Sequence, residues 1–150
     1  MENLTNAYSQ TKMKKSINIS HKANAVMVQD AIASFPNECC GFFFGKEVDS
    51  RIVEHALPVT NEKKGDQRRR FSISPLDYMR AEQHAEAKGV KLLGIYHSHP
   101  LHPAWPSVHD RVQAMPWFSY VILSVNANDV THINSFQLNE ARLFELETII

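Results

Sequence analysis

The sequence predicts one α/β domain of the mixed α+β type, in which helices pack against a mixed β-sheet. Two observations predict this class. Strand-like and helix-like segments alternate first, and three consecutive segments rich in branched and aromatic residues follow. The length of 150 residues also suits one domain that can bury its own core. Such a chain needs no metal merely to fold, so a metal site in it would indicate chemistry.

The composition limits which binding partners and which cellular compartment we expect for this protein. Residues 1–15 are polar and lack the apolar core of a signal peptide, so we predict a flexible tail over 1–15 and a domain over 16–150. Sixteen basic residues balance sixteen acidic ones, which argues against nucleic acid or a membrane surface as the partner. The only cysteines, Cys39 and Cys40, are adjacent and poorly placed to pair. We expect a cytoplasmic protein.

The first helix is predicted from its cap and from its apolar spacing. It follows a short strand at 17–20, with Ser20 as its cap and Pro36 at its end. Four apolar residues at helical spacing are expected to face the core. They are Ala25, Val28, Ile32 and Phe35.

The next segments predict a buried strand pair and a polar loop. Residues 38–46, ECCGFFFGK, are apolar on both faces, which favours a strand buried on both sides. A partner strand is expected at 51–59, a basic surface loop at 60–70 and a further strand at 70–73.

The second half begins with a helix whose two ends are marked. Ser74 and Pro75 are typical of a helix start and Gly89 of a helix end, so we predict a helix over 75–88. A strand at 90–99 and a short helix at 107–115, capped by Ser107, come next. Three more strands are expected, at 118–125, 131–138 and 142–149.

Two histidines at the end of the 90–99 strand are the first candidates for metal ligands. His97 and His99 stand at i and i+2, so in an extended chain they project from the same face. Histidine pairs are also common on surfaces, so this spacing alone leaves both readings open. The prolines at 100, 103 and 106 stiffen the following loop, which can bring Asp110 back to the same edge. Two imidazoles and one carboxylate suit zinc with one position left for water.

Other residues are further candidates for ligands or for the general base. His102 lies in the proline loop and His109 points about 100° away from Asp110 around the helix, so both are expected to face solvent or substrate. Cys39 and Cys40 are expected to be small buried side chains. Glu38 opens a buried strand, where an unpaired carboxylate is costly, and is either the general base or an exposed residue before the strand.

The motif made by these residues resembles that of the JAMM, or MPN-plus, zinc metallopeptidases. The family pattern is an early glutamate, then H-x-H-P, seven residues, a serine, two residues and an aspartate. Glu38, His97-Ser98-His99-Pro100, Ser107 and Asp110 match it without substitution. The likeness extends over residues 17–145, through NECCGFFFG, RFSISPLD, GIYHSHP, PSVHD and SYVILSV.

The resemblance implies a role for each matching position. His97, His99 and Asp110 would bind Zn²⁺, Glu38 would handle the proton of the catalytic water, and Ser107 would stabilise the oxyanion. It also implies a mixed sheet between helices in a cytidine-deaminase-like arrangement.

The short length is similar to that of bacterial Mec-type enzymes. This similarity implies cleavage of an amide bond at the C-terminus of a ubiquitin-like sulfur-carrier protein with a Gly-Gly tail. Lys63, Lys64 and Arg68–Arg70 could attract an acidic carrier or simply form a solvated loop. Alternatives are a zinc hydrolase of small peptides, cell-wall fragments or isopeptide conjugates, and a non-catalytic MPN interaction module.

Overall fold

The computed structural model describes residues 15–150, so the tail predicted over 1–15 falls outside the described residues except for Lys15. The described part forms seven strands and three helices. Their bounds are β1 Ser16–Ile19, α2 His21–Ser34, β2 Cys40–Glu47, β3 Arg51–Val59, α3 Pro75–Lys88, β4 Lys91–Pro100, α4 Val108–Gln113, β5 Ser119–Val125, β6 Val130–Leu138 and β7 Phe144–Ile149.

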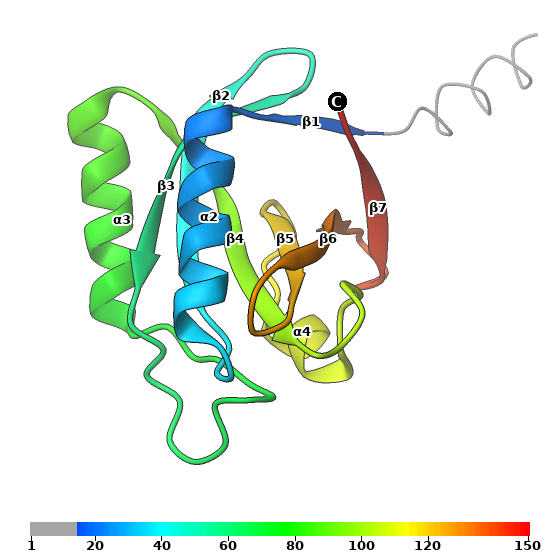
Figure 1. The fold of residues 1–150 in the computed structure, drawn as a ribbon. Helices are drawn as coiled ribbons and strands as arrows, with labels where there is room; N and C mark the ends of the chain where they lie inside the picture. Colours follow the sequence, from blue (N-terminus) through cyan, green and yellow to red (C-terminus); the bar gives the residue numbers. More distant parts are fainter. Residues whose placement is uncertain (1–14) are drawn as a thin grey trace, which may run out of the picture.

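The strands form one mixed sheet that closes on itself in the order β1-β3-β2-β4-β5-β6-β7 (Figure 1). β4 runs parallel to β5, and the short β1 runs parallel to both β3 and β7 and so joins the two ends. The remaining neighbours are antiparallel. The mixed α+β class is confirmed, whereas the closure of the sheet was not predicted. The cytidine-deaminase-like arrangement stays a prediction.

The apolar core lies on both faces of β2, as its sequence predicted. Phe43 packs in a cluster with α2, whereas Phe42 and Phe44 pack in a second cluster with α3. Cys39 and Cys40 are both buried as free thiols, and they fall in different clusters because neighbours on an extended chain face opposite sides. The expectation that both are small buried side chains is confirmed.

The face that α2 turns to the core differs from the predicted stripe. Ser20 caps the helix, and its hydroxyl accepts a hydrogen bond from the N–H of Ala23. Ala25 is exposed, while Val28, Ile32 and Phe35 only flank the buried face. The buried residues are Ala23, Met27 and Ala31. Their i, i+4 spacing places two small side chains against the sheet, which lets the helix approach it closely.

The strand predicted at 70–73 is wrong, because this segment is irregular. Its backbone groups bond within the loop: the N–H of Ser72 donates to the side chain of Asn61, and the carbonyl of Ser72 accepts from Glu62. The helix that follows is confirmed, with Ser74 as its cap and Gly89 at its end in the left-handed region, at φ 64°. Among residues 15–150, no helix has the length and apolar character needed to cross a membrane.

Candidate metal centre

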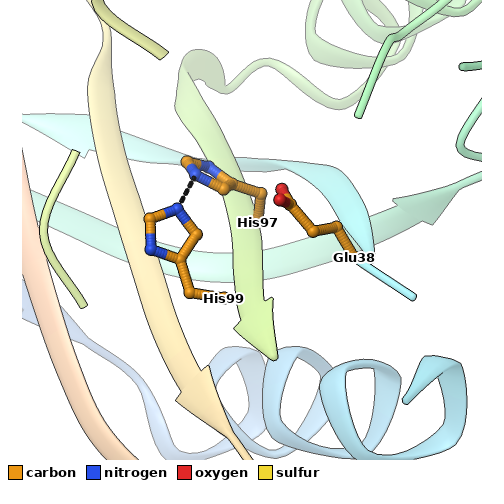
Figure 2. A group of neighbouring side chains, drawn as sticks. All are labelled: Glu38, His97 and His99. Atoms are coloured by element: carbon orange, nitrogen blue, oxygen red, sulfur yellow. Dashed lines mark hydrogen bonds between the residues drawn. The ribbon is translucent and has the colours of Figure 1, made fainter. Parts of the chain in front are cut away.

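Strand β4 carries two histidine side chains to the same side of the sheet. The Nε2 atoms of His97 and His99 lie 3.2 Å apart, and both rings are buried (Figure 2). Phe71 stacks on the ring of His97, with ring centroids 4.6 Å apart. Nδ1 of His99 lies 2.9 Å from the carbonyl oxygen of Pro103, so a proton on Nδ1 leaves the Nε2 lone pair free for a metal.

Helix α4 carries Asp110 to the same point. Oδ2 of Asp110 lies 3.2 Å from Nε2 of His97 and 3.2 Å from Nε2 of His99. A capping box orients this carboxylate: the N–H of Ser107 donates to Oδ2 at 2.9 Å, and the N–H of Asp110 donates to the Ser107 hydroxyl at 3.0 Å. Burial opposes ionisation, but His97, His99 and the N–H of Ser107 together outweigh it and hold the pKa of Asp110 below its usual range.

The proline-rich loop before α4 is fastened to the sheet. The N–H of Leu101 donates to Val125 at 2.9 Å, and the side chain of Asn134 donates to the carbonyl of Ala104 at 3.0 Å. The hydroxyl of Ser124 donates to the carbonyl of His102. These contacts from β5 and β6 fix the path of the loop, so the return of the chain to β4 does not depend on the prolines alone.

The three atoms fit a tetrahedral metal ion. Ligands at about 2.0 Å from a tetrahedral zinc lie about 3.3 Å from one another, close to the 3.2 Å seen on all three sides of this triangle. Two imidazole lone pairs and a carboxylate oxygen repel one another in the absence of a cation or a shared proton. The donor set therefore fits a bound metal.

Glu38 brings a second carboxylate to the site. One of its oxygens lies within 4.8 Å of ligand nitrogens of His97 and His99, a group that could hold a metal ion (Figure 2). The side chain is 3% exposed, and Oε1 has no hydrogen-bond partner among the described residues. Burial, followed by the charge of Asp110, raises the pKa of Glu38 to about 9. A nearby metal cation would oppose this shift.

A cleft of about 530 Å³ opens onto the centre. Glu38, His99 and Ser107 line it together with His102 and His109, which were expected to face solvent or substrate. Neither His102 nor His109 belongs to the triangle formed by His97, His99 and Asp110. The structure therefore gathers all five predicted site residues, Glu38, His97, His99, Ser107 and Asp110, at one place, and their individual roles stay predictions.

Sequence reasoning missed Asn61, which links two residues that line the cleft, Glu38 and Arg70. Its side-chain N–H₂ donates to the carbonyls of Glu38 and Arg70, both at 3.1 Å. Its side-chain oxygen accepts from the N–H groups of Lys63 and Ser72. The available signal was an asparagine at the first turn of a polar loop, where such side chains commonly bond nearby backbone.

Comparison with models of protein families identifies the family of this chain. The family model described as prokaryotic homologs of the JAB domain matches residues 20–139. The chain belongs to this bacterial JAMM/MPN family. The resemblance noted in the sequence is thereby confirmed at the family level.

Relatives of this JAB-family chain include a protease named for cleaving a protein conjugate and a desampylase. A probable TtuB-protein conjugate cleaving protease of Thermus thermophilus is 34% identical over 91 residues, covering 61% of this chain and 58% of the relative. A desampylase of Pyrococcus furiosus is 31% identical over 98 residues, covering 63% of this chain and 64% of the relative. The matched region thus spans about three fifths of these relatives.

Solved structures support the fold over most of the chain. A solution structure of protein DSY2949 from Desulfitobacterium hafniense superposes with a TM-score of 0.78 at 31% identity, covering 89% of this chain and 91% of that one. A solution structure from Salinibacter ruber gives a TM-score of 0.68 at 31% identity, with 89% and 90% covered.

Proposed function

We propose that this JAB-family chain is a zinc-dependent metallopeptidase that hydrolyses an amide bond at the C-terminus of a ubiquitin-like sulfur-carrier protein. One observation carries the proposal: two imidazole nitrogens and a carboxylate oxygen form a 3.2 Å triangle beside the buried carboxylate of Glu38. His99 and Glu38 also line an open cleft. Three protein ligands with a fourth position open are typical of catalytic rather than structural zinc.

In this proposal, His97, His99 and Asp110 hold the ion. Bound zinc would polarise the scissile carbonyl and acidify a coordinated water. The carboxylate of Glu38 takes a proton from the attacking water and delivers it to the leaving nitrogen. Its buried position beside His97 and His99 places this carboxylate next to the ion that these residues would hold.

Ser107 is proposed to stabilise the developing oxyanion. Its Oγ accepts a hydrogen bond from the N–H of Asp110, and its own hydroxyl hydrogen has no acceptor among residues 15–150. This hydrogen can therefore point into the cleft that Ser107 lines. A donor aimed at the position of the oxyanion stabilises the transition state more than the substrate.

The names of the relatives support the proposed substrate class. One relative is named for cleaving a protein conjugate and another is named a desampylase. A third, 32% identical over 109 residues that cover 67% of this chain and 41% of the relative, is named a Lys-63-specific deubiquitinase of Xenopus tropicalis. Within this group we favour the bacterial Mec-type activity on a carrier with a Gly-Gly tail. The cytoplasm is the compartment that we propose, since Cys39 and Cys40 are free thiols.

The test measures zinc and product together. Purified protein should take up about one zinc per chain, and ubiquitin-like carriers from the same genome, each extended at its C-terminus, should lose the mass of the extension. Cleavage should stop when the metal is chelated and return when zinc is restored. Unchanged carrier masses with a zinc-loaded enzyme, or cleavage of small peptides alone, would contradict the proposed substrate.

A further inference from the structure

Arg70 places an unpaired positive charge inside the candidate active-site cleft. It lines the cleft together with Glu38 and Ser107. No carboxylate among residues 15–150 lies within ion-pair distance of its guanidinium; the ion pairs found involve Arg51, Arg80, Lys91 and the site histidines. A guanidinium without a carboxylate partner is a ready binding group for one on a ligand.

The backbone of Arg70 is fixed relative to the proposed base. The side-chain amide of Asn61 donates to the carbonyl of Glu38 and to the carbonyl of Arg70, each at 3.1 Å. The side-chain amide of Asn61 thus links Glu38, the proposed base, to Arg70. Arg70 is therefore held beside Glu38 even though it ends a long basic loop.

The guanidinium of Arg70 also contacts helix α4. Its Nη1 lies 3.3 Å from Nδ1 of His109, a weak contact that leaves the other N–H groups of Arg70 without an acceptor in the described residues. His109 lies on α4, one residue before Asp110. Arg70 therefore reaches from the loop toward the helix that carries a proposed metal ligand, and it is one of the residues that line the cleft.

We propose that Arg70 binds the free α-carboxylate of the residue that is released, so that the enzyme removes a single C-terminal amino acid rather than opening an isopeptide. The inference rests on the proposed function and names its substrate class. In a linear extension of one residue, the carboxylate is only two bonds from the scissile nitrogen, which receives its proton from Glu38. An isopeptide presents an aliphatic lysine side chain at that point and offers nothing to an arginine.

The test compares two substrates that differ in one group. Carriers or synthetic peptides ending in Gly-Gly-Ala are prepared with a free C-terminal carboxylate and with a carboxamide, and a Gly-Gly isopeptide to lysine serves as a third substrate. Wild type should cleave the carboxylate form about 10- to 100-fold more efficiently than the amide, the range expected for a charge-assisted pair. Arg70→Gln should lose this preference, which is read as the ratio of the two rates within each variant.

The same basic loop supplies the matched control. Arg68→Gln removes the same charge, but Arg68 does not line the cleft, so its preference for the carboxylate should stay that of wild type. Because Arg69 also lines the cleft, the double change R69Q/R70Q checks whether one arginine replaces the other. Zinc content and the thermal unfolding midpoint confirm that each variant is folded and loaded.

A binding measurement separates recognition from catalysis. Zinc-loaded Glu38→Gln should bind the carboxylate peptide about 10- to 100-fold more tightly than the amide, and the added change Arg70→Gln should remove the difference. Equal cleavage of all three substrates, or equal losses in Arg68→Gln and Arg70→Gln, would overturn the role of Arg70 and leave the peptidase standing. If wild type cleaves no substrate, the proposed function fails instead, and equal binding of the two peptides would then also refute the role of Arg70.

Discussion

The phenyl ring of Phe71 lies against the imidazole of His97 at a centroid distance of 4.6 Å, with 27° between the ring planes. Phe71 belongs to the irregular segment before α3, and His97 is fully buried on β4. The stack closes one side of the metal centre with an apolar surface and restricts the rotation of a proposed ligand. Apolar and hydrogen-bonding neighbours of this kind set the orientation of metal ligands.

Phe71→Ala should weaken both the fold and the zinc site. Removal of a buried phenylalanine costs roughly 3–5 kcal/mol of unfolding free energy, and loss of ligand support lowers metal affinity by about 10- to 100-fold. Denaturant unfolding and chelator competition measure the two effects. Phe44→Ala is the control: Phe44 is buried in the same cluster but contacts His55 and His84. Equal loss of zinc in both variants would contradict a specific role for Phe71.

Glu38→Gln should separate metal binding from cleavage. The amide keeps the shape of the side chain but takes up no proton, so the rate should fall by about 10²- to 10⁴-fold. Zinc content should stay near that of wild type, because the 3.2 Å triangle does not include Glu38. Glu62→Gln, at an exposed position of the same region, should leave both unchanged. A Glu38→Gln variant as fast as wild type would refute the assignment of the base.

Ser107→Ala should lower the rate more than it lowers stability. Loss of the cap costs about 1 kcal/mol, whereas loss of one oxyanion donor reduces turnover about 10²- to 10³-fold. Zinc should remain, because the backbone N–H of residue 107 still supports Asp110. Ser74→Ala removes the matching cap of α3 and should reproduce the stability loss alone. Normal turnover in Ser107→Ala would limit this serine to capping.

Asn61→Asp should slow cleavage without removing zinc. The carboxylate still accepts from Lys63 and Ser72, but it presents oxygen to the carbonyls of Glu38 and Arg70, where the amide donated. We expect kcat/KM to fall by at least about tenfold, because both donated bonds are lost and a single bond of about 1.4 kcal/mol already corresponds to a factor of ten.

Asn126 is the control for Asn61, because its side chain accepts hydrogen bonds and donates none among the described residues. The side chain of Asn126 accepts from the N–H groups of Asn128 and Asp129 in the turn before β6. Asn126→Asp keeps both bonds and should cleave at the wild-type rate. A slow Asn126→Asp variant, or a normal Asn61→Asp variant, would show that Asn61 does not position the base.

Asp30 should make stability fall as pH rises. Burial raises its pKa, against hydrogen bonds from Tyr96 on β4, from Cys39 and from Ser34 on its own helix. A carboxyl that binds its proton more tightly in the folded chain contributes fully below its unfolded pKa, near 3.8, and loses this contribution as pH passes the folded value.

Asp30→Asn removes this titration and keeps an acceptor for Tyr96. The unfolding free energy of the variant relative to wild type should therefore rise from pH 4 to pH 8 in urea titrations of metal-free protein. Asp49→Asn, in the exposed turn between β2 and β3, serves as the reference. A flat difference between Asp30→Asn and wild type would show that Asp30 ionises normally.

Local spacing predicted the centre, and long-range contacts decided what it missed. Residues close together in the chain determine the i, i+2 geometry of His97 and His99 and the cap of α4 at Ser107. Both features could therefore be predicted from the sequence. Residues 70–73 have strand-like composition, but they bond to Asn61 and Glu62 and find no strand partner. The face of α2 was set by how closely the sheet admits Ala23 and Ala31, which periodicity within one helix does not reveal.

The closed sheet also determines how the molecule meets other chains. Every strand in residues 15–150 has a neighbour on both sides over at least part of its length, which shortens the rows of unpaired backbone groups that can template aggregation. This protection passes through β1, which pairs with β3 on one side and β7 on the other. Loss of Ser16–Ile19 would leave both β3 and β7 without this neighbouring strand. Resistance to aggregation therefore depends in part on four residues far in sequence from the metal centre.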